Sequence, residues 1–239
     1  NIIREVKFPY IPPPGYSKDT ISWPKGDIIP DTLTGINIEK LSIISWKLIS
    51  DNGYGGNAFA FMVLHKGIPV TEAYKPQFNK NTRFLSWSVA KSFVNGLVGV
   101  LVKEGGLDIN QPTGLEEWQN DDRRNITWND LMRMQSGLEW NEDYGNRSDV
   151  TVMLHCTNNM AKFAYDKPLK YPIGSNFLYS SGTVNIISYL LRKHFNDDNA
   201  YYAFPYEHLF YRIGITDAVF ETDPSGTFVG SSYLYATAR

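Results

Sequence analysis

The hydrophobic side chains between residues 88 and 104 recur at helical spacing. The intervals i, i+3 and i+4 are filled by Ala90, Phe93, Val94, Leu97, Val98 and Leu101. This pattern predicts an amphipathic helix, and Gly105-Gly106 is a stop signal at its end. Gly96 and Gly99 lower the helix propensity inside the segment, so we expect another backbone to approach it closely and the helix to be central.

Two shorter patterns precede this helix. Apolar residues at helical spacing predict a helix over residues 38–50, which a glycine cluster ends. Residues 58–65 and 68–74 are two apolar, β-prone runs separated by Lys66-Gly67. They predict a β-hairpin whose second strand is weakened by Pro69.

The chain divides into four expected regions. Residues 1–37 contain six prolines, which fix backbone angles and remove amide donors, and they predict an extended N-terminal arm. Residues 38–106 are expected to form the first part of an α/β domain that includes the helix after residue 88. Residues 107–211 predict a mostly helical region, and residues 212–239 lead back toward the α/β domain.

The composition is that of a globular protein. Of the 239 residues, 42% are hydrophobic and 20% are charged, which is enough to bury a sizeable core. A formal net charge of -2 without a basic stripe gives no reason to expect nucleic acid as a partner. The single cysteine, Cys156, excludes an intrachain disulfide and is expected to be a small buried hydrophobic residue. No apolar run approaches the length of a membrane span.

Ser88 and Lys91 are three residues apart at the start of the predicted central helix. At that spacing, two side chains project from the same face of a helix and can reach each other. A lysine in a desolvated pocket has a lowered pKa, and its neutral amine can take the proton of a serine nucleophile. A helix-capping serine followed by a surface lysine has the same spacing, so the pair alone leaves both interpretations open.

A second serine and lysine with this spacing, Ser22 and Lys25, lie in the expected arm. Pro24 lies between them and prevents this segment from forming a helix. Ser88 is therefore the candidate nucleophile.

The segment Phe84-Leu85-Ser86-Trp87-Ser88-Val89-Ala90-Lys91-Ser92-Phe93 resembles the active-site helix of the class C β-lactamase-like serine hydrolases. That family includes β-lactamases, penicillin-binding D-alanyl-D-alanine carboxypeptidases, esterases and 6-aminohexanoate-dimer hydrolases. Residues 104–108 and 131–138 resemble further segments of the family in the same order, and the resemblance begins at about residue 58. It implies an α/β fold of the α+β type, β-lactamase/transpeptidase-like, in which an antiparallel sheet is flanked by helices.

Tyr179-Ser180-Ser181 stands where the family has Tyr-x-Asn. The resemblance implies that Tyr179 is a general base or proton relay and that Ser181 lies in the substrate-binding part of the site. Serine in place of asparagine is closer to the esterase and oligomer-hydrolase side of the family than to the lactamases. From the residue alone, Tyr179 also fits a packed tyrosine that bonds a backbone carbonyl.

Glu142-Asp143-Tyr144 resembles the 6-aminohexanoate-dimer hydrolase branch. By this resemblance its carboxylates, Asp143 among them, are candidates for binding a substrate ammonium at the rim of the pocket. A solvated acidic loop is the other interpretation. The four histidines show no ligand spacing, so we expect neither a metal nor another cofactor.

The family's third motif, Lys-Thr-Gly or His-x-Gly, is not found after Tyr179. His65-Lys66-Gly67 matches the His-x-Gly pattern, but it precedes Ser88 and lies in the predicted hairpin turn. We therefore expect the C-terminal strands of the fold to be missing here. The natural protein is expected to continue beyond Arg239, and the remainder to be a separate chain or to have been lost by cleavage after this arginine. The resemblance favours the bacterial periplasm or cell envelope.

Together, these observations predict a serine hydrolase that forms an acyl-enzyme on Ser88, with Lys91 and Tyr179 moving the proton. A small-molecule or peptide-like amide or ester is the expected substrate. The alternative is a non-catalytic binding or scaffold protein that retains the same fold.

Overall fold

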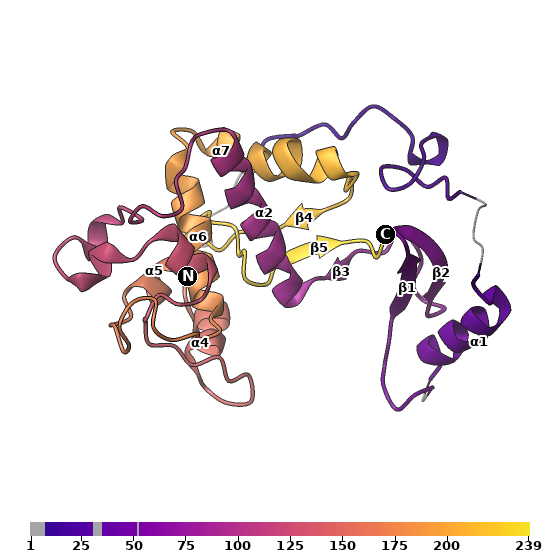
Figure 1. The fold of residues 1–239 in the computed structure, drawn as a ribbon, viewed down its shortest axis with the longest axis horizontal. Coiled ribbons are helices and arrows are strands. Elements are labelled where there is room, and N and C mark those ends of the chain that lie inside the picture. Colours follow the sequence, from indigo (N-terminus) through magenta and orange to yellow (C-terminus); the bar gives the residue numbers. More distant parts are fainter. Residues whose placement is uncertain (1–7, 31–34, 52) are drawn as a thin grey trace. The chain divides into compact units, whose positions relative to one another are not determined.

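The structure is a computed structural model that describes residues 8–30, 35–51 and 53–239 (Figure 1). The α-helices of these residues are α1 (Ile38–Ile49), α2 (Ala90–Lys103), α3 (Trp128–Met132), α4 (Asp149–Cys156), α5 (Met160–Tyr165), α6 (Ser181–His194) and α7 (Asp198–Pro205). The strands are β1 (Ala60–His65), β2 (Ile68–Tyr74), β3 (Phe84–Leu85), β4 (Val219–Phe220) and β5 (Leu234–Ala236). The mixed α/β class and the mostly helical stretch after α2 are as predicted. None of the described helices is long and apolar enough to cross a membrane.

The described chain forms two compact units. Of the described residues, one unit comprises 8–11, 85–209 and 219–234, and the other comprises 12–30, 35–51, 53–84, 210–218 and 235–239. These units divide the chain at other points than the four regions expected from the sequence, which stay a prediction. The expected arm lies partly outside the described residues, and its described part is irregular apart from the short 3-10 helix η1 (Lys18–Thr20).

The smaller unit contains α1 and the predicted hairpin, and both predictions are confirmed. Helix α1 starts where the Asn37 side chain accepts a hydrogen bond from the Lys40 amide at 2.8 Å. Strands β1 and β2 are antiparallel, and the turn residues Lys66 and Gly67 have φ angles of 49° and 79°. Two consecutive positive φ angles match the twist of a two-residue hairpin, which is why a glycine suits this turn. The pairing is irregular between Val63 and Leu64.

The larger unit is built around α6. Every residue of α6 from 181 to 188 is buried, and α2, α3, α4, α5 and α7 all contact it. Helix α2 is amphipathic instead and buries one face, which consists of Ala90, Val94, Leu97, Val98 and Leu101. The predicted helix is therefore confirmed, but α6 is the more central of the two.

The expected close approach of another backbone at Gly96 and Gly99 of α2 was wrong. A Cβ atom on Gly96 would meet only the Leu209 side chain, at 3.3 Å, and one on Gly99 would meet nothing within 4 Å. The expectation for Cys156 was also wrong, because this residue is exposed at the end of α4. A small residue in an apolar-rich segment does not by itself indicate on which face of a helix it lies.

A short sheet with the strand order β3-β5-β4 also bears on the site. The Ser86 amide, which follows β3, donates to the Leu234 carbonyl at 2.8 Å. The chain segment that enters α2 is thereby fixed to the last part of the chain.

Candidate active site

Ser88 lies in the 3-10 turn η2 (Trp87–Val89), which runs directly into α2. Lys91 Nζ is 3.0 Å from Ser88 Oγ, so the predicted contact is present. The sequence predicted that Ser88 starts the α-helix itself, whereas the α-helix begins at Ala90. Trp87 has a φ of 46°, a left-handed conformation that costs a non-glycine residue about 1–2 kcal/mol. This bend leaves the Ser88 side chain exposed.

The Lys91 amine is surrounded by oxygen atoms from distant parts of the chain. It donates to Ser181 Oγ at 3.1 Å and to the Ser231 carbonyl at 2.8 Å. Burial lowers the pKa of Lys91, while the Tyr179 hydroxyl and the Glu142 carboxylate act in the opposite direction. A lowered pKa makes the neutral amine, the form that a general base requires, more abundant at a given pH.

Tyr179 lies just before α6, with its ring centroid 5.1 Å from Lys91 Nζ. The side chain is 39% exposed, so it faces both the lysine and solvent. The structure thus brings Tyr179 to the Ser88 and Lys91 pair, as the resemblance implied.

Ser181 is the first residue of α6, and its side chain is fully buried. Its hydroxyl donates to Glu142 Oε1, and its amide donates to Glu142 Oε2 at 2.9 Å. Ser180 caps the helix by accepting from the Thr183 amide at 3.0 Å. The structure therefore places the Ser181 hydroxyl between Lys91 and Glu142, and its contact with a substrate stays a prediction.

The two carboxylates of the Glu142-Asp143-Tyr144 segment have different surroundings. Glu142 points inward and also accepts from Trp140 Nε1 at 2.5 Å and from the Tyr144 hydroxyl at 3.0 Å. Burial raises the pKa of Tyr144 to about 12, so its hydroxyl stays protonated and available as a donor. Asp143 is exposed, and its carboxylate accepts from the Gly145 amide at 2.8 Å, within its own loop. The role of Asp143 in substrate binding stays a prediction.

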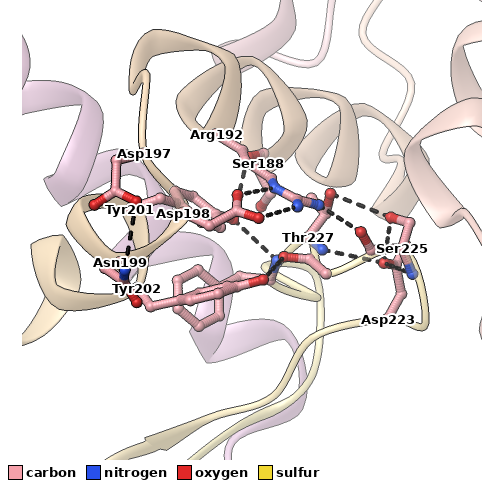
Figure 2. Close-up of polar contacts among 12 residues, drawn as sticks. Ser188, Arg192, Asp197, Asp198, Asn199, Tyr201, Tyr202, Asp223, Ser225 and Thr227 are labelled. Carbon is pink, nitrogen blue, oxygen red and sulfur yellow. Dashed lines mark hydrogen bonds and ion pairs between the residues drawn. The ribbon is translucent and has the colours of Figure 1, made fainter. Parts of the chain in front are cut away.

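The sequence did not identify Ser231 as a site residue, because Ser231 contributes a backbone carbonyl, and no residue type indicates such a group. The Ser231 amide donates to Asn185 Oδ1 of α6 at 3.1 Å. Figure 2 shows how the preceding loop is held: Asp223 accepts from the Ser225 amide at 2.9 Å, and Arg192 of α6 donates to the Ser225 carbonyl. Helix α6 thus fixes the position of the carbonyl that Lys91 contacts.

Nearby contacts secure the same loop. Tyr202 of α7 donates to the Gly226 carbonyl at 3.0 Å, and the Phe228 amide donates to the Tyr201 hydroxyl at 2.9 Å (Figure 2). The buried Tyr201 and Phe228 rings also lie together, with centroids 4.8 Å apart. Within the described part of the chain, no group of three or more His, Cys, Asp or Glu side chains could hold a metal ion.

Comparisons with known proteins agree with this fold. Residues 51–239 match the sequence model of the Beta-lactamase family. A search of curated proteins found no match. The structure is similar to a protein described as a 6-aminohexanoate-dimer hydrolase from Bacillus anthracis, with 21% identity and a TM-score of 0.65 over 99% of this chain and 60% of that chain.

Two further solved structures are similar. One is the D-alanine carboxypeptidase AmpC from Burkholderia cenocepacia, with 18% identity and a TM-score of 0.60 over 84% of this chain and 62% of that chain. The other is a penicillin binding protein from Bacillus halodurans, with 16% identity and a TM-score of 0.56 over 75% of this chain and 66% of that chain. The chain thus spans less than two thirds of the length of each of these structures.

The fold and the family match define a protein of the β-lactamase/transpeptidase class. The chain belongs to the Beta-lactamase family, whose members are serine hydrolases that act on amides and esters.

Proposed function

We propose that the protein is a serine hydrolase that cleaves an amide or ester through an acyl-enzyme on Ser88. Lys91 is the general base, and Tyr179 relays the proton. The observation that carries this proposal is the 3.0 Å contact between Lys91 Nζ and the exposed Ser88 Oγ, made by a lysine whose pKa burial lowers.

The reaction proceeds in two halves. As Ser88 Oγ bonds to the substrate carbonyl carbon, its proton passes to Lys91 Nζ, and the Ser88 backbone amide stabilises the oxyanion. Collapse of the tetrahedral intermediate breaks the bond to the amine or alcohol, which leaves with a proton relayed from Lys91 through Tyr179. Water then attacks the acyl ester, gives its proton to the same base, and releases the acid while Ser88 regains its proton.

The same site and the structural relatives support a proposal for the substrate class. An exposed nucleophile accepts a small-molecule or peptide-like substrate, and the structural relatives include a protein described as a 6-aminohexanoate-dimer hydrolase and a D-amino acid amidase from Ochrobactrum anthropi. A linear amide or an ester is therefore the substrate we propose, with Asp143 at the rim as a candidate contact for a substrate ammonium.

Labelling with a fluorophosphonate tests the proposal, because this probe phosphonylates only activated serines. We expect one label on the wild-type protein, located on Ser88 by peptide mass mapping, and none on Ser88→Ala. Ser22→Ala is the matched control, because it removes the serine of the other pair with the same spacing, and it should label like the wild type. A folded wild-type protein that takes no label at Ser88 would overturn the proposal in favour of a binding or scaffold protein.

A further inference from the structure

We propose that Glu142 is a positioning residue: it fixes the direction of the Ser181 hydroxyl, and this leaves the lone pair of Lys91 aimed at Ser88. The inference rests on the proposed acyl-enzyme function. It assigns a role to a carboxylate that does not contact the nucleophile.

Four hydrogen bonds from this chain converge on the Glu142 carboxylate. Oε2 accepts from Trp140 Nε1 at 2.5 Å and from the Ser181 amide at 2.9 Å. Oε1 accepts from the Tyr144 hydroxyl at 3.0 Å and from the Ser181 hydroxyl. An ionised carboxylate is an acceptor only, so it determines where each of these hydrogen atoms points.

The consequence passes through Ser181 to the lysine. A serine hydroxyl has one hydrogen atom, and here Glu142 takes it. At the 3.1 Å contact between Lys91 Nζ and Ser181 Oγ, the lysine must therefore be the donor. The Ser231 carbonyl, 2.8 Å from the same nitrogen, can only accept and takes a second lysine hydrogen.

A neutral lysine amine has two hydrogen atoms and one lone pair. Both hydrogen atoms of Lys91 are used by Ser181 and Ser231, so the lone pair is left for Ser88 Oγ at 3.0 Å. This is the orientation that proton transfer from Ser88 requires. After the transfer, the ammonium group has three donors for the same three oxygen atoms, and no group has to move.

Replacing Glu142 by glutamine separates this role from simple packing. Trp140 Nε1 and the Ser181 amide can only donate, so they hold the amide oxygen of the new side chain in the Oε2 position. The amide nitrogen then faces Ser181 Oγ and donates to it. The Ser181 hydroxyl hydrogen is turned toward Lys91, which at 3.1 Å is a nearer acceptor than the Tyr144 hydroxyl at 3.5 Å. There it occupies the lone pair that should face Ser88.

A simple charge effect makes a different prediction. The titratable groups that act on Lys91 are Tyr179 and Glu142, and Tyr144 faces Ser181 beside them. Loss of the Glu142 charge lowers the pKa of Lys91, so the pH at which labelling reaches half its plateau falls in either case. The less basic amine also accepts a proton less readily, so a charge effect lowers the plateau slightly, and it does so equally with and without the Ser181 hydroxyl. Only the positioning role makes the loss in the plateau depend on that hydroxyl.

The experiment measures the rate constant of fluorophosphonate labelling of Ser88 against pH for the wild type, E142Q, S181A and the double variant E142Q/S181A. We expect E142Q to lower the plateau by about 10- to 100-fold. In the S181A background the same substitution should change the plateau by no more than about 2-fold, because the hydroxyl that it misdirects is absent. E139Q is the matched control, since Glu139 is exposed and pairs only with the exposed Lys170 at 3.7 Å among the described side chains.

Circular dichroism and thermal unfolding confirm that each variant is folded. Equal losses from E142Q with and without S181A, or an unchanged plateau with a shifted midpoint, overturn the positioning role while the proposed function stands. A wild-type protein that takes no label at Ser88 overturns the proposed function and this role with it. The two failures are therefore distinguishable.

Discussion

The indole ring of Trp140 packs so closely against Gly182, the second residue of α6, that a Cβ atom there would lie 2.5 Å from the ring. The same indole donates to Glu142, which in turn binds both polar groups of Ser181. Packing at the start of α6 and the polar contacts around Lys91 are therefore parts of one arrangement.

Substitution of Gly182 by alanine should disturb this arrangement. The added methyl group would also approach the Ala164 Cβ atom at 2.9 Å, so the Trp140 ring must move away. Overpacking of a filled core lowers the free energy of unfolding by about 1–3 kcal/mol, which urea denaturation would measure. Because Glu142 moves with Trp140, labelling of Ser88 should also slow.

Gly99 provides the control for this substitution. It also lies inside a helix, α2, but a Cβ atom there would meet nothing within 4 Å. Gly99→Ala should raise the free energy of unfolding by about 0.5–1 kcal/mol, because alanine favours helix more than glycine does. Equal effects of the two substitutions would contradict the packing explanation.

Lys91→Met should abolish the reactivity of Ser88. The substitution keeps an unbranched side chain of nearly the same length but removes the amine, and general-base catalysis contributes about 10²–10⁴-fold to the rate. Labelling by a fluorophosphonate, followed by intact mass, gives the comparison. Lys25→Met is the control, and a rate for Lys91→Met equal to the control would exclude Lys91 as the base.

The labelling rate of the wild type should rise with pH. The reactive form is the neutral amine, so the rate increases as pH passes upward through the pKa of Lys91. Because burial lowers this pKa, the midpoint should lie below the ordinary lysine value of about 10.4. Rates measured between about pH 5 and pH 10 test this, and a rate that is flat or falls across the range would contradict it.

Asn185→Ala should affect both stability and reactivity. It removes the oxygen that accepts from the buried Ser231 amide, and a buried donor without a partner costs about 1–3 kcal/mol. The Ser231 carbonyl would lose its fixed position beside Lys91, so Ser88 labelling should slow as well. Thermal unfolding and labelling measure the two effects. Asn199→Ala, at an exposed position on α7, should change neither by a comparable amount.

Local patterns in the sequence predicted the elements that depend on neighbouring residues. The spacing of apolar side chains predicted α1 and α2, and Lys66-Gly67 predicted the hairpin turn. Both features depend on interactions within a few residues. The sequence pattern did not predict correctly what surrounds a given side chain in the folded protein. The glycines of α2 and the exposed Cys156 show that a residue type does not identify what lies opposite it.

The sequence by itself placed Ser88 and Lys91 within reach of each other, because side chains three residues apart at the start of a helix project from the same face. Only the tertiary structure decided what surrounds the lysine amine. Ser181 and Ser231 reach it across 90 and 140 residues of chain, and Glu142 reaches Ser181 across 39. These contacts depend on how α6 and the following loop pack against α2, and one of them uses a backbone carbonyl that every residue possesses.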